Sequence, residues 1–211
     1  GSLYQPVYGS DDDLVLYLPM SEGSLDTSTQ FDRSPYGNDG TLNGGVICNS
    51  TSSNRSTGRY GGACYFDGTD DYIDVGDPDS LDLGNSDFTV EFWMNAKGKT
   101  NAGLVDKETG SAGFRVIFEG RVIKPLIDDG TEVQVNGGVT LDLDRWYHVV
   151  SVFDRDDLLT IYLDGENIKT QDISGSGGSI SNSDPLTIGV KRGSDQNSPF
   201  NGTIDEVRIY K

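Results

Sequence analysis

The chain has 211 residues, a size that suits one large β-sandwich or two small domains. Only 34% of the residues are hydrophobic, but aromatic residues (9%) and glycines (28 residues) are frequent, which favours many short strands joined by turns and argues against a disordered chain. The formal net charge of −18 argues against nucleic acid and anionic membrane surfaces as partners, and no segment approaches the roughly 18 apolar residues needed to cross a bilayer.

Alternating or apolar runs bounded by turn residues recur along the whole chain, and each predicts a β-strand. The predicted strands cover residues 14–18, 63–66, 72–75, 88–94, 102–105, 113–118, 122–127, 131–135, 146–153, 158–163, 167–171, 186–189 and 203–210. Glu119-Gly120 and Asp164-Gly165 predict two tight hairpins, because glycine accepts the positive φ that short turns need. One helical turn is expected within 78–83. The pattern predicts an all-β protein of two packed antiparallel sheets.

The last predicted strand alternates apolar and charged side chains. Ile204, Val207 and Ile209 are apolar, whereas Asp205 and Arg208 are charged. This pattern is typical of a strand with one buried face. We expect such a closing strand to lie inside a sheet, because its neighbours on both sides depend on its hydrogen bonds.

The domain organisation is predicted to be simple. Residues 1–12 are interpreted as an N-terminal extension whose leading Gly1-Ser2 resembles a cloning scar, and residues 13–211 as one domain. The Ser/Gly-rich segment 174–179 lies between predicted strands and is expected to be a surface loop. Since no signal peptide is present, we expect the domain to be excised from a larger extracellular protein and to be monomeric on its own.

Two cysteines, Cys48 and Cys64, flank a polar segment of 15 residues. A disulfide that closes such a loop stabilises a protein by about 3 kcal/mol in the chain-entropy model. Two buried free thiols are the alternative. Asn49, Asn54 and Asn201 each begin a glycosylation acceptor pattern. Disulfide and glycosylation sites together indicate an extracellular or cell-surface location.

Several sequence blocks follow one another in an order that resembles a known family. They are Leu14-Val-Leu-Tyr-Leu-Pro-Met-Ser-Glu-Gly23, Asp32-Arg-Ser-Pro-Tyr-Gly-Asn-Asp-Gly-Thr41, Tyr60-Gly-Gly-Ala-Cys-Tyr-Phe-Asp-Gly68 with Asp71-Tyr-Ile-Asp-Val75, Phe88-Thr-Val-Glu-Phe-Trp93 with Trp146-Tyr-His-Val-Val150, and Gly202-Thr-Ile-Asp-Glu-Val-Arg-Ile-Tyr210. Over residues 13–210 the chain resembles the laminin-G-like (LamG-like) jelly rolls of the concanavalin A-like lectin/glucanase superfamily. The resemblance implies a two-sheet jelly-roll β-sandwich with its first and last strands side by side, and a non-catalytic extracellular module that binds carbohydrate or mediates cell adhesion.

The resemblance also implies a structural calcium ion, Ca²⁺, near the ends of the domain. Glu22, the Gly23 carbonyl and Asp205 match its expected ligands best, with Asp32 and Asn38 as second-rank candidates. Oxygen donors of this kind suit Ca²⁺, which takes six to eight of them. The alternative is that Asp32 caps its turn and that Asp205 pairs with a basic residue such as Arg208.

No catalytic residues are predicted, so the chain is not expected to be an enzyme. Retaining glycoside hydrolysis needs two carboxyl groups about 5 Å apart, which positions i and i+2 of one strand approach. Asp142 and Asp144 have this spacing but are interpreted as turn caps. The single histidine, His148, and both tryptophans, Trp93 and Trp146, are expected to be structural members of the core blocks. The alternative for the tryptophans is that they are platforms on which a sugar stacks.

The sequence therefore predicts a non-catalytic recognition module whose partner is a glycan or a surface protein. The ligand-binding residues are unknown, and the loops 96–101, 107–111 and 192–199 are the expected places for them because of their composition. Two alternatives stay open. One is a spacer or protein-docking domain of a surface protein, and the other is a glycoside hydrolase or polysaccharide lyase.

Overall fold

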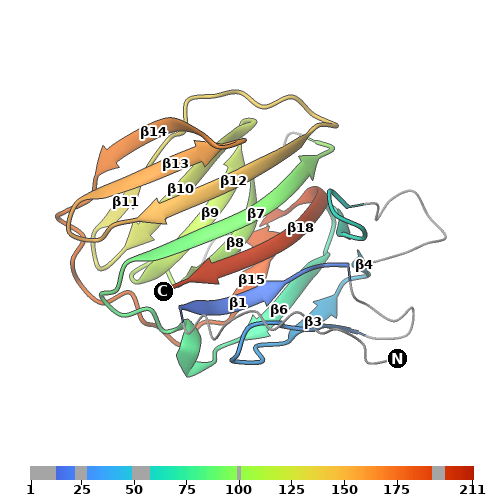
Figure 1. Cartoon of the computed structure of the whole chain (residues 1–211), viewed down its shortest axis with the longest axis horizontal. Coiled ribbons are helices and arrows are strands. Elements are labelled where there is room, and N and C mark those ends of the chain that lie inside the picture. Colours follow the sequence, from blue (N-terminus) through green and yellow to red (C-terminus); the bar gives the residue numbers. More distant parts are fainter. Residues whose placement is uncertain (1–12, 22–27, 49–57, 99–100, 192–197) are drawn as a thin grey trace, which may run out of the picture.

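The computed structural model describes residues 13–21, 28–48, 58–98, 101–191 and 198–211. Two large antiparallel sheets pack face to face, and the first of them faces the reader in Figure 1. This confirms the predicted jelly-roll sandwich. Within the described residues no helix is long and apolar enough to span a membrane.

The first sheet has the strand order β14-β13-β12-β7-β18-β5-β4, with β1 also paired to β18. Its strands are β1 (Leu14–Leu18), β4 (Ile47–Cys48), β5 (Cys64–Asp67), β7 (Phe88–Ala96), β12 (Trp146–Phe153), β13 (Leu158–Leu163), β14 (Glu166–Asp172) and β18 (Asn201–Tyr210).

The second sheet has the order β11-β10-β9-β8-β15-β6-β3-β2. Its strands are β2 (Thr29–Gln30), β3 (Gly40–Asn43), β6 (Tyr72–Gly76), β8 (Asn101–Glu108), β9 (Gly113–Glu119), β10 (Val122–Asp128), β11 (Glu132–Gln134) and β15 (Leu186–Ile188). A small ribbon pairs β16 (Val190–Lys191) with β17 (Ser198–Pro199), and η1 (Asp79–Leu81) forms the expected helical turn.

Each predicted strand corresponds to a strand of the structure, with ends that differ by a few residues. The strands that sequence patterns did not predict are β2, β3, β4, β16 and β17, each of two to four residues. Alternation needs more residues than these to show a period of two. Such short strands are set by their neighbours in the sheet.

The core lies between the two sheets and follows from strand alternation. In β7 the side chains Phe88, Val90, Phe92 and Met94 are buried, while those between them face away from the core. Phe88 stacks on Phe153 of the neighbouring β12 with ring centroids 4.2 Å apart. The intervening residues of β7 and β12 therefore form an outer face of the first sheet that faces away from the second sheet.

Strand β18 is the centre of the first sheet. It pairs with β7 on one edge, while β5 and β1 share its other edge. The pairing of Leu18 with Val207 confirms that the first and last strands are neighbours. A β-bulge with positive φ (54°) at Glu206 shifts the register between Asp205 and Arg208. Asp205 thus lies within the strand, not at its start, and residues on both faces of this stretch are buried.

Both predicted hairpins are present. The turn between β13 and β14 is Asp164-Gly165, with φ values of 51° and 84°. The turn between β9 and β10 is Gly120-Arg121, one residue later than predicted, with φ values of 59° and 68°. Two central residues with positive φ match the twist of the strands that they connect.

The predicted disulfide joins Cys48 of β4 to Cys64 of β5, two residues that face each other across the strand pair. The bond closes a loop with a sequence separation of 16. It ties the segment that precedes β5 to the edge of the first sheet.

The disulfide is expected to contribute about 3 kcal/mol to the free energy of unfolding, because it restricts the unfolded chain. The double variant Cys48→Ser/Cys64→Ser should therefore unfold at a lower urea concentration than the wild type. Dithiothreitol should lower the midpoint of the wild type and leave the double variant unchanged. Equal midpoints for the two proteins without reductant would show that the bridge does not stabilise the fold.

Candidate functional site

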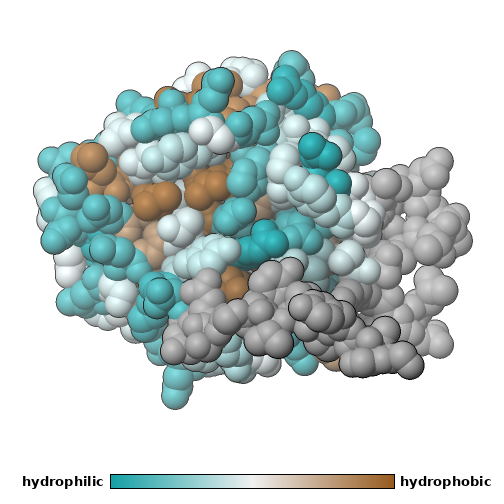
Figure 2. Space-filling model, viewed as in Figure 1, coloured by the Kyte–Doolittle hydropathy of each residue, from teal (hydrophilic) through white to brown (hydrophobic). Residues whose placement is uncertain are grey.

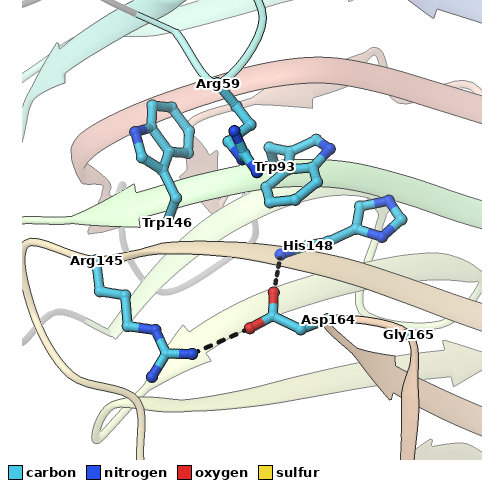
Figure 3. Close-up of a pocket in the computed structure, with 7 residues that line it drawn as sticks. All are labelled: Arg59, Trp93, Arg145, Trp146, His148, Asp164 and Gly165. Atoms are coloured by element: carbon cyan, nitrogen blue, oxygen red, sulfur yellow. Dashed lines mark hydrogen bonds and ion pairs between the residues drawn. The ribbon is translucent and has the colours of Figure 1, made fainter.

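A pocket of about 670 Å³ opens on the outer face of the first sheet. It is lined by Arg59, Trp93, Arg145, Trp146, His148, Asp164 and Gly165 (Figure 3). We call it the tryptophan pocket. Its volume is within the usual range of small-ligand sites, which combine aromatic walls with a few polar groups. The same face carries half-buried Val150 and Val152. In Figure 2 apolar side chains lie in the middle of this face and hydrophilic ones surround them.

Strand pairing brings the pocket's aromatic side chains together. His148 of β12 lies opposite Trp93 of β7, and Trp146 lies opposite Asn95. The His148 and Trp93 rings stack with centroids 4.8 Å apart. Trp146 makes no ring stacking or cation–π contact with any other residue that the structure describes. Of the two indoles, Trp93 is therefore held in a stack, while Trp146 lines the pocket without a ring contact from the described residues.

The segment 58–62 covers Trp93 and brings a cation into the pocket. The Arg59 guanidinium lies over the Trp93 ring at 4.9 Å from the centroid, and Tyr60 contacts the same indole edge-on at 5.8 Å. In Figure 3 the Arg59 side chain lies between the two indole rings. Arginine over the face of tryptophan is an attractive arrangement because the ring face carries negative charge density.

Asp205 fixes the backbone of this segment. Its Oδ2 accepts hydrogen bonds from the backbone N–H groups of Arg59 and Tyr60 at 2.8 and 3.1 Å. A side chain at Gly58 would place its Cβ 2.6 Å from Oδ2, so the chain approaches the carboxylate where glycine allows it. Asp205 is fully buried, and burial raises its pKa to about 6.

A chain of charged and aromatic groups continues from the pocket across the outer face. His148 Nε2 is 2.9 Å from Glu91 Oε1, and Arg208 Nη1 is 3.7 Å from the same oxygen. The hydrogen bond from His148, together with the charge of Arg208, lowers the pKa of Glu91 below its usual range despite partial burial. Glu91 is therefore ionised at neutral pH and holds both partners in place.

The far end of this chain reaches the first strand. Arg208 forms an ion pair with Glu206 and lies over the Tyr17 ring at 4.3 Å, while the Tyr17 hydroxyl donates to Glu206 at 2.9 Å. Burial, followed by the charge of Glu206, raises the pKa of Tyr17 to about 12. The hydroxyl thus stays protonated as a donor, and these contacts join β1 to β18 on the outer face.

The hairpin between β13 and β14 forms the remaining wall of the pocket. Asp164 accepts the backbone N–H of His148 at 2.9 Å and pairs with Arg145 at 3.3 Å. Dashed lines mark both contacts in Figure 3. The Arg145 charge is therefore partly neutralised by a carboxylate of this chain.

The structure corrects the prediction that Trp93 and Trp146 belong to the core. Both are half-buried on the outer face, and both line the pocket. His148 forms a hydrogen bond with Glu91, as suits the predicted structural role, and it also lines the pocket. The sequence contained a signal for this, because Trp93 alternates with Phe92 and Met94 and shares its face with Glu91 and Asn95.

The described members of the predicted metal site fall into two hydrogen-bond networks, one that joins Asp32 to Asn38 and one around Asp205. Asp32 accepts hydrogen bonds from the backbone N–H groups of Tyr17 and Asn38 and from both Ser34 donors. The Asn38 amide donates to the Val15 carbonyl at 2.8 Å. Glu22 and Gly23 lie outside the described residues. Asp205 keeps one buried carboxylate oxygen, Oδ1, that accepts no hydrogen bond from the described residues.

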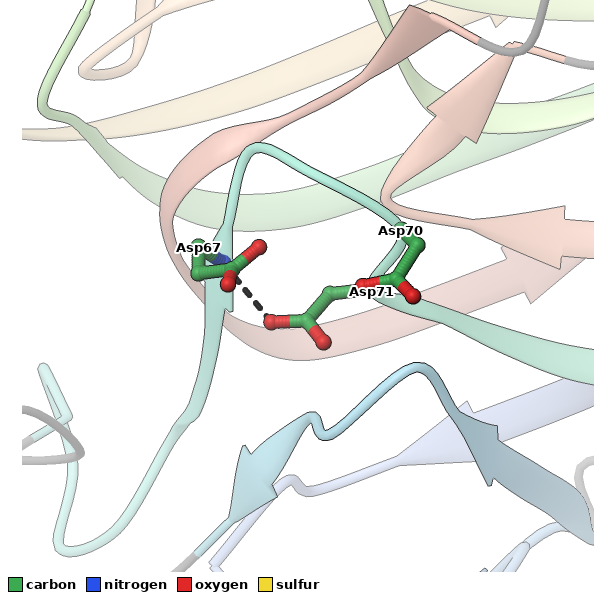
Figure 4. Close-up of side chains that lie close together, drawn as sticks. All are labelled: Asp67, Asp70 and Asp71. Atoms are coloured by element: carbon green, nitrogen blue, oxygen red, sulfur yellow. Dashed lines mark hydrogen bonds between the residues drawn. The ribbon is translucent and has the colours of Figure 1, made fainter.

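A different group of acids lies in the turn between β5 and β6. Carboxylate oxygens of Asp67, Asp70 and Asp71 are all within 4.8 Å of one another (Figure 4). Asp71 is buried and accepts the backbone N–H of Asp67 at 2.7 Å. Burial first, then the neighbouring carboxylates, raise the pKa of Asp71. The hydrogen bond from the Asp67 N–H explains why Asp71 is buried here, because its carboxylate closes the turn between β5 and β6.

Sequence reasoning overlooked one pair of acids at positions i and i+2. Asp106 and Glu108 belong to β8, and both are nearly fully buried. Each contacts Arg115 of the adjacent β9, at 3.7 Å for Asp106. The two carboxylates are thus partners of one guanidinium. Asp142 and Asp144, which the sequence offered instead, form exposed ion pairs with Arg121 and Lys97.

None of the described residues in the loops predicted to contact a ligand lines the tryptophan pocket. Lys107 is buried and bonds to Asp77 and to the Asp184 carbonyl, so its charge is not available to a ligand. Residues 99–100 and 192–197 lie outside the described residues. Of the predicted glycosylation sites, Asn49 and Asn54 also lie outside them, and Asn201 begins β18 with a buried side-chain oxygen. Its glycosylation stays a prediction.

Comparison with known proteins places the chain in a family. The model of a family described as "Concanavalin A-like lectin/glucanases superfamily" matches residues 67–211, more than half of the chain. The chain therefore belongs to this superfamily, as the sequence blocks indicated.

A relative described as "Non-toxic nonhemagglutinin" from Paraclostridium bifermentans is 29% identical over 126 residues, which are 57% of this chain and 11% of the relative. The binding domain of Paraclostridial Mosquitocidal Protein 1 is similar in structure, with a TM-score of 0.75, 18% identity, and coverage of 96% of this chain and 49% of that chain. Domain 4 of AbnA, a GH43 extracellular arabinanase from Geobacillus stearothermophilus solved with arabinotriose, has a TM-score of 0.72, 16% identity, and coverage of 94% and 92%. At these identities the structural likeness shows the fold alone.

The contact between His148 and Glu91 is expected to stabilise the fold at neutral pH. Because the folded-state pKa of Glu91 is lowered, its contribution is present above the usual glutamate pKa and is lost as the pH falls through the folded-state value. Glu91→Gln should lower the free energy of unfolding at pH 7 by about 1 kcal/mol, the size of a partly exposed charged hydrogen bond. Urea unfolding at pH 7 and pH 3 measures this, and the difference should shrink at pH 3.

Glu132→Gln is the matched control, since Glu132 is exposed on the edge strand β11. This variant should match the wild type at both pH values. A Glu91→Gln deficit of the same size at pH 7 and pH 3 would mean that packing, not ionisation, sets the contribution of Glu91.

Proposed function

We propose that this chain is a non-catalytic extracellular carbohydrate-recognition module that binds a saccharide in the tryptophan pocket. The observation that carries the proposal is Trp146, a half-buried indole on a sheet face that contacts no other ring of the described residues. Beside it lie hydrogen-bonding groups of Asp164 and Arg145. Sugars present one apolar face of C–H groups and a rim of hydroxyls, which suits an aromatic wall with polar groups at its margin.

The comparisons support a binding role. The fold is shared with the binding domain of Paraclostridial Mosquitocidal Protein 1 and with a domain of an extracellular arabinanase that was solved with arabinotriose. Another domain of this fold comes from botulinum neurotoxin DC and was solved in complex with rat synaptotagmin II, so a protein partner is the alternative. The open indole favours a saccharide, because a single recessed ring offers little area for a protein interface.

Replacing Trp146 tests the site. Trp146→Ala should weaken saccharide binding at least tenfold, whereas Trp146→Phe should retain part of the affinity because a smaller ring remains. A glycan array identifies a binding saccharide, and isothermal titration calorimetry then compares the variants. Tyr162→Ala is the control, because Tyr162 faces outward on the neighbouring β13 but does not line the pocket.

Two results would contradict the proposal. One is a bound saccharide whose affinity is unchanged in Trp146→Ala. The other is silence across the array, which would favour the alternative of a spacer or protein-docking domain.

We also propose that Ca²⁺ stabilises the domain through Asp205. The support is its buried carboxylate oxygen Oδ1, which accepts no hydrogen bond from the described residues. In contrast, within the described residues both oxygens of the Asp32 carboxylate accept hydrogen bonds from N–H or O–H donors. Oxygen ligands that no proton donor occupies suit a hard cation.

Calcium is therefore expected to raise the melting temperature relative to EDTA. At 100 times the Kd, linkage gives about 2.7 kcal/mol, which corresponds to roughly 5 to 10 °C for a domain of this size. Asp205→Asn should remove the shift. An unchanged melting temperature in the wild type, together with no calorimetric heat on adding Ca²⁺, would refute this proposal.

A further inference from the structure

Arg59 reaches the tryptophan pocket from a backbone that is held on two sides. The disulfide between Cys48 and Cys64 closes the loop that contains it, and Asp205 accepts its backbone N–H. The Gly58 N–H also donates to the Gly61 carbonyl at 2.9 Å, so the segment forms a tight turn. The backbone that carries the Arg59 side chain is therefore held by contacts within the chain.

The guanidinium itself has no oxygen partner in the described part of the chain. Its contacts there are the ring faces of Trp93 at 4.9 Å and Tyr60 at 5.3 Å. Stacking engages the face of the planar group and leaves the N–H donors at its edge unused. Arg59 is also exposed, so these donors are accessible.

Other arginines of the chain are used differently. Five of the other six described arginines contact carboxylate or carbonyl oxygens, namely Arg115, Arg121, Arg145, Arg155 and Arg208. This is expected in a chain with 34 acidic and 16 basic residues. Arg33 lies over the Phe31 ring at 5.8 Å, outside the pocket. Among the described arginines that line the pocket, Arg59 is stacked on rings, whereas Arg145 pairs with a carboxylate.

We propose that the tryptophan pocket selects acidic saccharides, and that Arg59 binds the sugar carboxylate while the sugar ring stacks on Trp146. The proposal rests on the proposed function and names the ligand class of the same site. A planar guanidinium matches a carboxylate with two parallel N–H···O bonds, which are stronger than bonds to neutral acceptors. In Figure 3 the Arg59 side chain lies beside the Trp146 ring, so one sugar residue can reach both.

The other cationic groups of the pocket are committed to carboxylates of the chain. Arg145 pairs with Asp164, and His148 with Glu91. Arg59 is therefore the cation in the described pocket that remains for the ligand. The net charge of −18 repels anions at long range, so selectivity has to arise from short-range contact.

Matched pairs of saccharides test the proposal, because the members of a pair differ only in whether the sugar carboxyl group is free or esterified. Suitable pairs are trigalacturonate with its methyl ester, and N-acetylneuraminyl-lactose with its methyl ester, supplemented by a glycan array grouped in the same way. Binding is measured by titration calorimetry for the wild type, Arg59→Gln, Arg59→Lys and Arg145→Gln. Melting temperatures confirm that each variant is folded.

In the wild type, the acidic member of a bound pair should bind at least tenfold more tightly than the neutral member. Arg59→Gln should remove this preference and leave the neutral member's affinity within about twofold, because neutral sugars do not use the charge. Arg59→Lys should be intermediate, since a lysine offers charge without the planar fork. Arg145→Gln should keep the preference.

Four results would overturn the inference. Equal affinities for the acidic and neutral members, or a preference that survives Arg59→Gln, would refute it while leaving the carbohydrate-binding proposal intact. A preference for sulfated over carboxylated saccharides would refute the carboxylate as the recognised group. If no saccharide binds at all, the proposed function fails first, and the ligand class fails with it.

Discussion

Strand β18 holds the first sheet together because both of its edges are in use over nearly all its length. One edge belongs to β7, and the other is divided between β5, opposite residues 201–204, and β1, opposite residues 207–210. The bulge at Glu206 lies where β5 ends and β1 begins. An extra residue at this point lets the strand turn its side chains to suit two different neighbours. The closing strand therefore joins the start, the middle and the end of the chain.

The bulge also decides which charged residues of β18 lie on the outer face of the sheet. Asp205 pairs opposite Trp93 and Arg208 opposite Glu91, so the sheet places a carboxylate beneath the 58–62 segment and a guanidinium beside Glu91. Without the extra residue, strict alternation would send either Asp205 or Arg208 into the core. The sequence shows a sign of this irregularity. Ile204 and Val207 are both core residues, but they are three positions apart, whereas residues on one face of a regular strand are an even number of positions apart.

Much of the fold could be predicted because long strands display their period directly. In β7, β12 and β13 burial alternates without a break, and family blocks lie on β7, β12 and β18 among other segments. The prediction for the tryptophans was wrong because membership in a core block of the family does not decide which face of the strand a side chain occupies. Their position in the alternation indicates the other face, where Trp93 has Glu91 and Asn95 as neighbours and Trp146 has His148.

The rest of the candidate site could not be predicted, because its walls come from segments that meet only in the folded sheet. Arg59 precedes Trp93 by 34 positions and belongs to a polar segment with no periodic pattern. Its place over the indole follows from two backbone hydrogen bonds to Asp205, a residue near the other end of the chain. The Asp205 carboxylate thus lies on the strand that closes the sheet, and it also holds the turn that carries Arg59. Strand pairing supplies the aromatic surface of the pocket, and the segment 58–62 supplies its charge. The proposed ligand class therefore depends on a segment whose place is set by the sheet but whose residue types do not follow from the strand pattern.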